Sequence, residues 1–193
     1  MQIKEETGLE IYYFSHREFL LFVYFVRTSK IHQDISFFYL FVTLNRNYLK
    51  DGKRFVYEAS KTVKLTPMNE WIKRGKDKKY IVKRLIKSDS LLSDSNLLKL
   101  KKAGELFDGK PYDLYFEWNN DRIYCSELVW KIYKNALGIE IGELKKVKDF
   151  NLSDPEVKKI LEKRYGNEIP LDETVISPES MFNSGLLKTV FKN

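Results

Sequence analysis

The segment that decides the fold is Trp118–Gly138, which reads WNNDRIYCSELVWKIYKNALG. Apolar residues in its second half recur at helical spacing, and Gly138 follows them where a helix commonly ends. The pattern predicts an amphipathic helix over Cys125–Leu137, with the chain's single cysteine at its N-terminus. The apolar positions of this helix are Leu128, Val129, Ile132, Tyr133, Ala136 and Leu137.

Cys125 is a candidate nucleophile because of its position at the start of that helix. The positive end of the helix dipole and the unpaired backbone N–H groups favour the thiolate, which is the nucleophilic form. The same N–H groups can stabilise an oxyanion on an attacked carbonyl. The competing interpretation is structural, because an unpaired cysteine is among the most often buried residue types. Position alone leaves both interpretations open.

A nucleophilic cysteine needs a histidine within hydrogen-bond reach, and the chain has two, His16 and His32. Each also fits an exposed loop or turn, since His16 lies among charges and His32 lies between two aromatic runs. An acid that orients the imidazole completes such a site. Glu58, in the apolar strand pattern FVYEA, is the candidate acid; the alternative places it on the solvent side of an alternating strand.

Composition narrows the classes of protein that the chain can be. It has 193 residues, 43% of them hydrophobic, which suits one compact domain over residues 1–193. One cysteine excludes an intramolecular disulfide framework, and two histidines with it are too few for the usual four-ligand zinc site without several carboxylates. We expect neither a structural metal nor an organic cofactor.

The positive charge is concentrated in one stretch. The chain has a net charge of +7, and residues 73–102 hold eleven Lys or Arg against three Asp, which is +8 and leaves −1 for the rest. Such a stretch suits an anionic substrate, membrane face or nucleic acid, or is simply a solvated surface. Nucleic acid is not the expected partner, because no helix-turn-helix, zinc-finger or RNP pattern accompanies the charge.

No stretch approaches the roughly 20 consecutive apolar residues of a membrane-spanning helix. The N-terminus, MQIKEETGLEIYYF, lacks the basic start, apolar run and cleavage site of a secretory signal. We therefore expect a cytoplasmic protein as the chain stands, or a periplasmic or secreted one if a leader is missing.

Local signals place further elements and indicate an α+β fold, with strands mainly early and helices mainly late. Residues 12–48 hold 12 of the 28 aromatic residues and are typical of buried strands or a short buried helix. Strands are predicted over residues 54–60, 62–65 and 80–86. Helices are predicted to start at Thr66-Pro67, at Ser93 or Asp94, at Ser153-Asp154-Pro155-Glu156 and at Ser177-Pro178.

From Arg54 onward the chain resembles the YiiX-like permuted papain-like hydrolases of the NlpC/P60 superfamily, over about three quarters of its length. The resemblance is carried by FDGKPYD (107–113), by the Y-C-S-E motif within residues 118–138, by FNLSDP (150–155) and by RYGNEIPLDETVISPESMF (164–182). It implies a circularly permuted papain-like fold, in which a small antiparallel sheet packs against a central helix that carries the cysteine.

The resemblance also implies a catalytic order of His, Glu and Cys along the chain. Cys125 matches the nucleophile, Glu58 in V-Y-E-A matches the acidic member, and Tyr124 would line the site. The family histidine lies in S-H-x-G about fifteen residues before the glutamate, and this chain has no such motif. The best match is His32, in TSKIHQDI and 26 residues before Glu58, while His16 keeps the local Ser-His pair.

The leading hypothesis is a thiol hydrolase or acyltransferase that cleaves an amide or ester bond of a peptide or lipid through a thioacyl-enzyme intermediate; the basic stretch would suit an anionic substrate. Two other classes stay open. The missing S-H-x-G motif motivates a catalytically inactive relative that serves as a binding module, and the basic stretch motivates a nucleic-acid-binding protein. In residues 1–48 the chain departs from the family pattern.

Overall fold

A three-stranded antiparallel sheet and a central helix organise the molecule. The computed structural model describes residues 22–25, 55–75, 78 and 80–192. The sheet has the order β1 (Phe22–Phe25), β4 (Tyr80–Leu85), β7 (Leu187–Lys192), so its edge strands come from opposite ends of the chain. Tyr24 pairs with Ile81 and Leu85 with Leu187 in this sheet. The predicted strand over residues 80–86 is confirmed.

The central helix is α4 (Cys125–Leu137), and its bounds agree with the prediction from the sequence. Gly138 ends it with a φ of 69°, a left-handed conformation that glycine adopts without strain. Leu128, Val129 and Ile132 are fully buried on this helix. Burial of each such side chain is worth about 1.5 to 3 kcal/mol, so packing fixes the helix and with it the position of Cys125.

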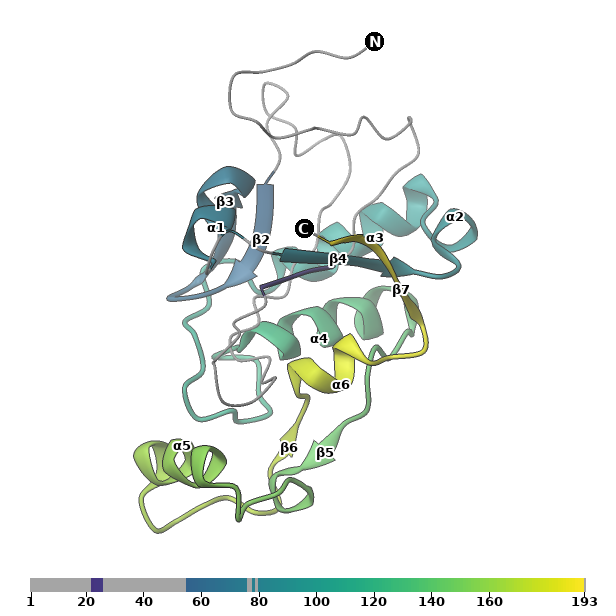
Figure 1. The fold of residues 1–193 in the computed structure, drawn as a ribbon. Helices are drawn as coiled ribbons and strands as arrows, with labels where there is room; N and C mark the ends of the chain where they lie inside the picture. The colour runs from purple at the N-terminus through teal and green to yellow at the C-terminus, as the bar shows by residue number, and fades with distance from the viewer. Residues whose placement is uncertain (1–21, 26–54, 76–77, 79, 193) are drawn as a thin grey trace.

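Helix α3 (Asp94–Glu105) and the hairpin over residues 55–67 flank α4 and build the main core. Helix α3 packs along α4, and the predicted face Leu97, Leu100, Ala103 and Phe107 is buried there. The Ser93 hydroxyl caps α3 by accepting the N–H of Asn96. Figure 1 shows α4 below the strands of the sheet and α3 behind them.

Strands β2 (Phe55–Ala59) and β3 (Val63–Pro67) pair as an antiparallel hairpin and confirm the two strands predicted over residues 54–60 and 62–65. Strand β2 contacts α4, and the Tyr57 hydroxyl donates to the Gly104 carbonyl of α3 at 2.7 Å. Helix α1 (Met68–Arg74) follows the hairpin and ends at Gly75. The hairpin is therefore tied to both helices of the core.

The predicted start of α1 is wrong. Thr66 was expected to cap the helix and Pro67 to be its first residue, but both are the last residues of β3, and the helix begins at Met68. The reason is a tertiary contact: the Thr66 hydroxyl donates to Oε1 of Glu58 at 2.6 Å instead of serving the helix end. Thr66 therefore belongs to β3 and hydrogen-bonds to Glu58 on β2, although the local sequence predicts a helix cap.

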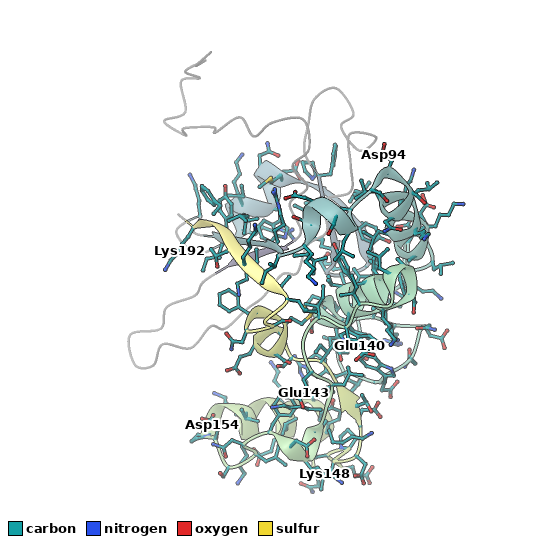
Figure 2. All side chains as sticks on the ribbon, turned by 90° about the vertical axis from the view of Figure 1, so that its right-hand side faces the viewer. Asp94, Glu140, Glu143, Lys148, Asp154 and Lys192 are labelled. Carbon is teal, nitrogen blue, oxygen red and sulfur yellow. The ribbon has the colours of Figure 1, made fainter. Side chains whose placement is uncertain are left out.

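The C-terminal third forms an outer unit beyond α4 and returns to the sheet. It comprises β5 (Lys145–Lys146), the 3-10 turn η4 (Val147–Asp149), α5 (Pro155–Tyr165) and β6 (Thr174–Val175), around Val147, Leu161 and Val175. Lys148 and Asp154 mark this unit at the bottom of Figure 2, far from Asp94 at the start of α3. The short helices α2 (Ser88–Leu91) and α6 (Pro178–Phe182) complete the fold.

The remaining starts are close to the sequence predictions. Asp154 accepts the Val157 N–H at 3.2 Å at the start of α5, and Ser177 accepts the Ser180 N–H at 3.0 Å at the start of α6. The described part of the chain contains no helix that is long and apolar enough to cross a membrane.

Candidate active site

Cys125 is the first residue of α4, and only 7% of its surface is exposed. Tyr124 precedes it in an extended conformation, with a φ of −100° and a ψ of 167°. Burial raises the pKa of the Cys125 thiol, while hydrogen bonds from the Ser126 backbone and the Tyr112 side chain act to lower it. The thiol therefore lies where backbone and phenol donors can support a negative charge.

Both neighbours of the thiol are fixed to the same residue of a distant segment. The Tyr124 hydroxyl accepts the Ile176 N–H at 3.0 Å, and the Ser126 hydroxyl donates to the Ile176 carbonyl at 2.7 Å. The Tyr124 ring packs edge-on against Phe116, with ring centres 5.0 Å apart. Burial raises the pKa of Tyr124, so its hydroxyl stays neutral at physiological pH. Its role in lining the site stays a prediction.

The segment 107–113 connects the nucleophile to the β2–β3 hairpin through the backbone. The Val63 N–H donates to the Lys110 carbonyl at 2.9 Å, and the Tyr112 N–H donates to the Lys61 carbonyl at 3.0 Å. On its other side, Ile123 donates to the Pro111 carbonyl at 3.1 Å. The segment therefore lies between the hairpin and the residues that lead into Cys125.

Tyr112 is the site residue that the sequence reasoning missed. It pairs with Ile123 in a short parallel bridge, and its side chain is hydrogen-bonded to the Cys125 thiol. The only signal for it was its place in the G-K-P-Y-D motif, which carried the resemblance but assigned no role.

Glu58 lies in the middle of β2 and is fully buried. Its neighbours Tyr57 and Ala59 are also buried, so both faces of the strand are covered and the solvent-side interpretation is wrong. Oε1 of Glu58 lies 2.5 Å from the Arg74 guanidinium and accepts the Thr66 hydroxyl.

The second oxygen of Glu58 is available. Among the residues that the structure describes, Oε2 has no hydrogen-bond partner. A buried carboxylate oxygen without a donor is costly, and a nearby imidazole N–H is one group that can satisfy it. His16 and His32 both lie outside the described residues. The structure thus brings the elements of Glu58 and Cys125 into contact and does not test either histidine.

Several described cations of the basic stretch over residues 73–102 are paired or buried. Arg74 pairs with the buried Glu58, and Lys101 lies 3.7 Å from Glu105 on α3. Lys83 is itself buried, and its ammonium lies 4.0 Å from the centre of the Phe182 ring. Part of the charge excess is therefore used inside the fold rather than offered to a partner.

Metal ligands do not gather in the described ranges: no three His, Cys, Asp or Glu side chains there lie close enough to hold an ion.

The comparisons with known proteins agree on one family. Residues 14–191 match the model of the permuted papain-like amidase enzymes, YaeF/YiiX, the C92 family. The chain is 46% identical over 144 residues to the uncharacterized protein YiiX of Escherichia coli (strain K12), which covers 75% of this chain and 70% of that protein.

A solved structure gives the same result for the fold. The crystal structure described as metalloprotein yiiX from Escherichia coli O157:H7, DUF1105, has a TM-score of 0.79 and 38% identity, over 93% of this chain and 99% of the other. The α+β, permuted papain-like fold predicted from the sequence is confirmed. The chain belongs to the permuted papain-like amidase family of YaeF and YiiX.

Proposed function

We propose that this protein is a cysteine hydrolase or acyltransferase that cleaves an amide or ester bond through a thioacyl-enzyme intermediate. The observation that carries the proposal is a thiol at the first residue of a buried helix, together with a buried carboxylate on β2, a strand that contacts this helix. The amidase description of the family supports an amide as the bond that is cleaved.

In the first half of the reaction, Sγ of Cys125 attacks the carbonyl carbon of the substrate, and a histidine takes the thiol proton. We assign this base to His32, with His16 as the alternative. The carbonyl oxygen becomes an oxyanion, which N–H groups at the start of α4 stabilise, and the Tyr112 hydroxyl is placed to contribute a further donor. The imidazolium then gives its proton to the leaving amine or alcohol.

In the second half, water or another nucleophile attacks the thioester carbonyl, and the histidine removes a proton from it. Cleavage of the C–S bond releases the acyl product and returns the proton to the thiol. Oε2 of Glu58 would accept the imidazole N–H and hold the ring in the reactive tautomer. Arg74 and Thr66 occupy Oε1 and so leave only Oε2 for this contact.

The test is the alkylation of Cys125 by iodoacetamide as a function of pH, in the wild type and in His32→Ala, His16→Ala and Glu58→Gln. Burial alone raises the pKa of the Cys125 thiol, so a titration well below the free-cysteine value of about 8.5 requires an adjacent imidazolium. We expect that low titration in the wild type, lost in one histidine variant and reduced in Glu58→Gln. Cys125→Ala is the control for labelling elsewhere.

A second measurement is mass spectrometry of the enzyme mixed with an activated acyl ester, which should show an acyl adduct on Cys125. An ordinary titration in all variants, together with no adduct, would refute the proposal and favour a binding module. Binding of nucleic acid that survives Cys125→Ala and weakens steeply with salt would instead favour the third hypothesis.

A further inference from the structure

A buried charge pair lies directly behind the nucleophile, on the same helix. Glu127 is fully buried and Lys131 is 7% exposed, although Glu and Lys four residues apart are common on the exposed face of a helix. Oε1 of Glu127 lies 2.6 Å from Nζ of Lys131. The proposed mechanism gives neither residue a role.

The carboxylate of Glu127 holds the backbone that leads into Cys125. The Tyr124 N–H donates to Oε2 of Glu127 at 3.4 Å, and Glu127 is the third residue of α4, which is the position of the acid in a capping box. This bond fixes the main chain of Tyr124, whereas the Ile176 contact fixes its hydroxyl. The residue before the nucleophile is therefore held at both ends.

The ammonium of Lys131 contacts the loop at residues 118–120, which precedes Tyr124. It donates to the Asn119 carbonyl and, at 2.9 Å, to Oδ1 of Asn120, and it lies 4.9 Å from the centre of the Trp118 ring. One end of the charge pair therefore contacts Tyr124 and the other contacts the loop at residues 118–120. Both segments lead directly to the thiol.

Burying the Glu127–Lys131 pair carries a desolvation penalty, so the pair is not explained by stability alone. Burial raises the pKa of Glu127 to about 7, despite the lowering effect of Lys131 and the Tyr124 N–H. Asp113, from the preceding loop, raises it further, and Lys131 is the cation that faces it. Well-packed apolar residues often replace a buried ion pair without loss of stability. They cannot replace the hydrogen bonds that Glu127 and Lys131 make to the backbone and the loop.

We infer that Glu127, together with Lys131, is a positioning residue that sets the direction in which Cys125 enters α4, and so aligns the thiol with the N–H groups of the helix start. The inference rests on the proposed function of Cys125. Glu127 acts only through Tyr124 and touches no reacting atom.

The variants separate geometry from charge and from folding. Glu127→Gln keeps an oxygen for the Tyr124 N–H but removes the charge. Glu127→Leu/Lys131→Met removes both charges and the contacts, and leaves no unpaired buried ion, so it should fold. Glu140→Gln is the matched control, because it removes the acid of the exposed Lys134–Glu140 pair near the other end of α4 (Figure 2).

With an activated acyl substrate, we expect the double variant to lower kcat at least tenfold, with KM within twofold of the wild type and an unchanged urea midpoint. Glu127→Gln should keep kcat within threefold at neutral pH, and Glu140→Gln should match the wild type. Equal kcat in the double variant and in Glu140→Gln would overturn the inference.

Hydrogen exchange of the Tyr124 amide gives a readout that does not depend on turnover. The amide should be protected in the wild type and in Glu127→Gln, and should exchange at least tenfold faster in the double variant. If the wild type neither turns over nor shows an altered thiol titration, the proposed function fails, while loss of protection still supports the positioning of Tyr124. Unchanged protection in the double variant would refute it.

Discussion

The buried carboxylate of Glu127 makes a sharp prediction about the pH dependence of stability. Burial raises its pKa from the ordinary value of 4.5 to about 7 in the folded protein. Between these values the folded state binds a proton that the unfolded state does not. The stability that this proton contributes is fully present below pH 4.5 and is lost as the pH rises through 7.

The size of the effect follows from the two pKa values. The interval between 4.5 and about 7, at about 1.4 kcal/mol for each tenfold change, corresponds to about 3 kcal/mol over the whole window. Glu127→Gln cannot titrate, so the free energy of unfolding of the wild type relative to this variant should fall by about 3 kcal/mol between pH 4.5 and pH 8. Titrating groups that do not interact with Glu127 are common to both proteins and cancel.

Urea unfolding followed by tryptophan fluorescence, at pH 4.5, 6, 7 and 8, measures this difference directly. Glu140→Gln is the control, because its carboxylate is exposed and its difference from the wild type should vary by less than about 0.5 kcal/mol. A difference between the wild type and Glu127→Gln that stays constant over the pH range, or that grows with pH, would refute the assignment of Glu127 as a desolvated carboxyl.

Four further replacements test the packing of the fold by urea unfolding. Arg74→Ala should lower the free energy of unfolding by about 1 to 2 kcal/mol, because it leaves the buried Glu58 carboxylate without its cation. The side chain of Arg74 is 39% exposed, which limits this loss, and no change would mean that the pair is not formed. Gly142→Ala should cost at least about 2 kcal/mol, since φ is 82° and the added carbon would lie 2.9 Å from the α6 backbone. Gly109→Ala, with a φ of 73° and nothing within 4 Å, should cost only about 1 kcal/mol, and equal costs would contradict the steric argument. Ile132→Ala should cost about 2 to 5 kcal/mol, and a cost below 1 kcal/mol would contradict its placement in the core.

The sequence predicted the central helix well because its signals are local. The apolar periodicity of residues 125–137 and the glycine after them depend only on neighbours along the chain. The family motif and the helix start pointed to Cys125, and the apolar setting of Glu58 left its burial open. The structure decided that burial, because α4, α1 and β3 lie on different sides of β2.

The parts that the sequence did not predict depend on distant contacts. Thr66 has the local character of a helix cap, and only the position of Glu58 on the adjacent strand redirects its hydroxyl. Glu127 and Lys131 have the spacing of an exposed pair, but both are buried, and Lys131 donates to the loop at residues 118–120. Nothing in the spacing of these residues along the chain indicates either contact.

The backbone connection through residues 107–113 has a consequence for how the site tolerates change. Main-chain hydrogen bonds link the hairpin that carries Glu58 to the segment and the segment to Ile123, two residues before Cys125, and one side-chain bond, from the Tyr57 hydroxyl to Asp108, adds to them. Main-chain bonds are nearly indifferent to which side chains the segment carries. The separation between the hairpin and the thiol therefore depends mainly on the backbone of this segment, and Asp108 and Tyr112 are side chains of the segment that hydrogen-bond to the hairpin and to the thiol.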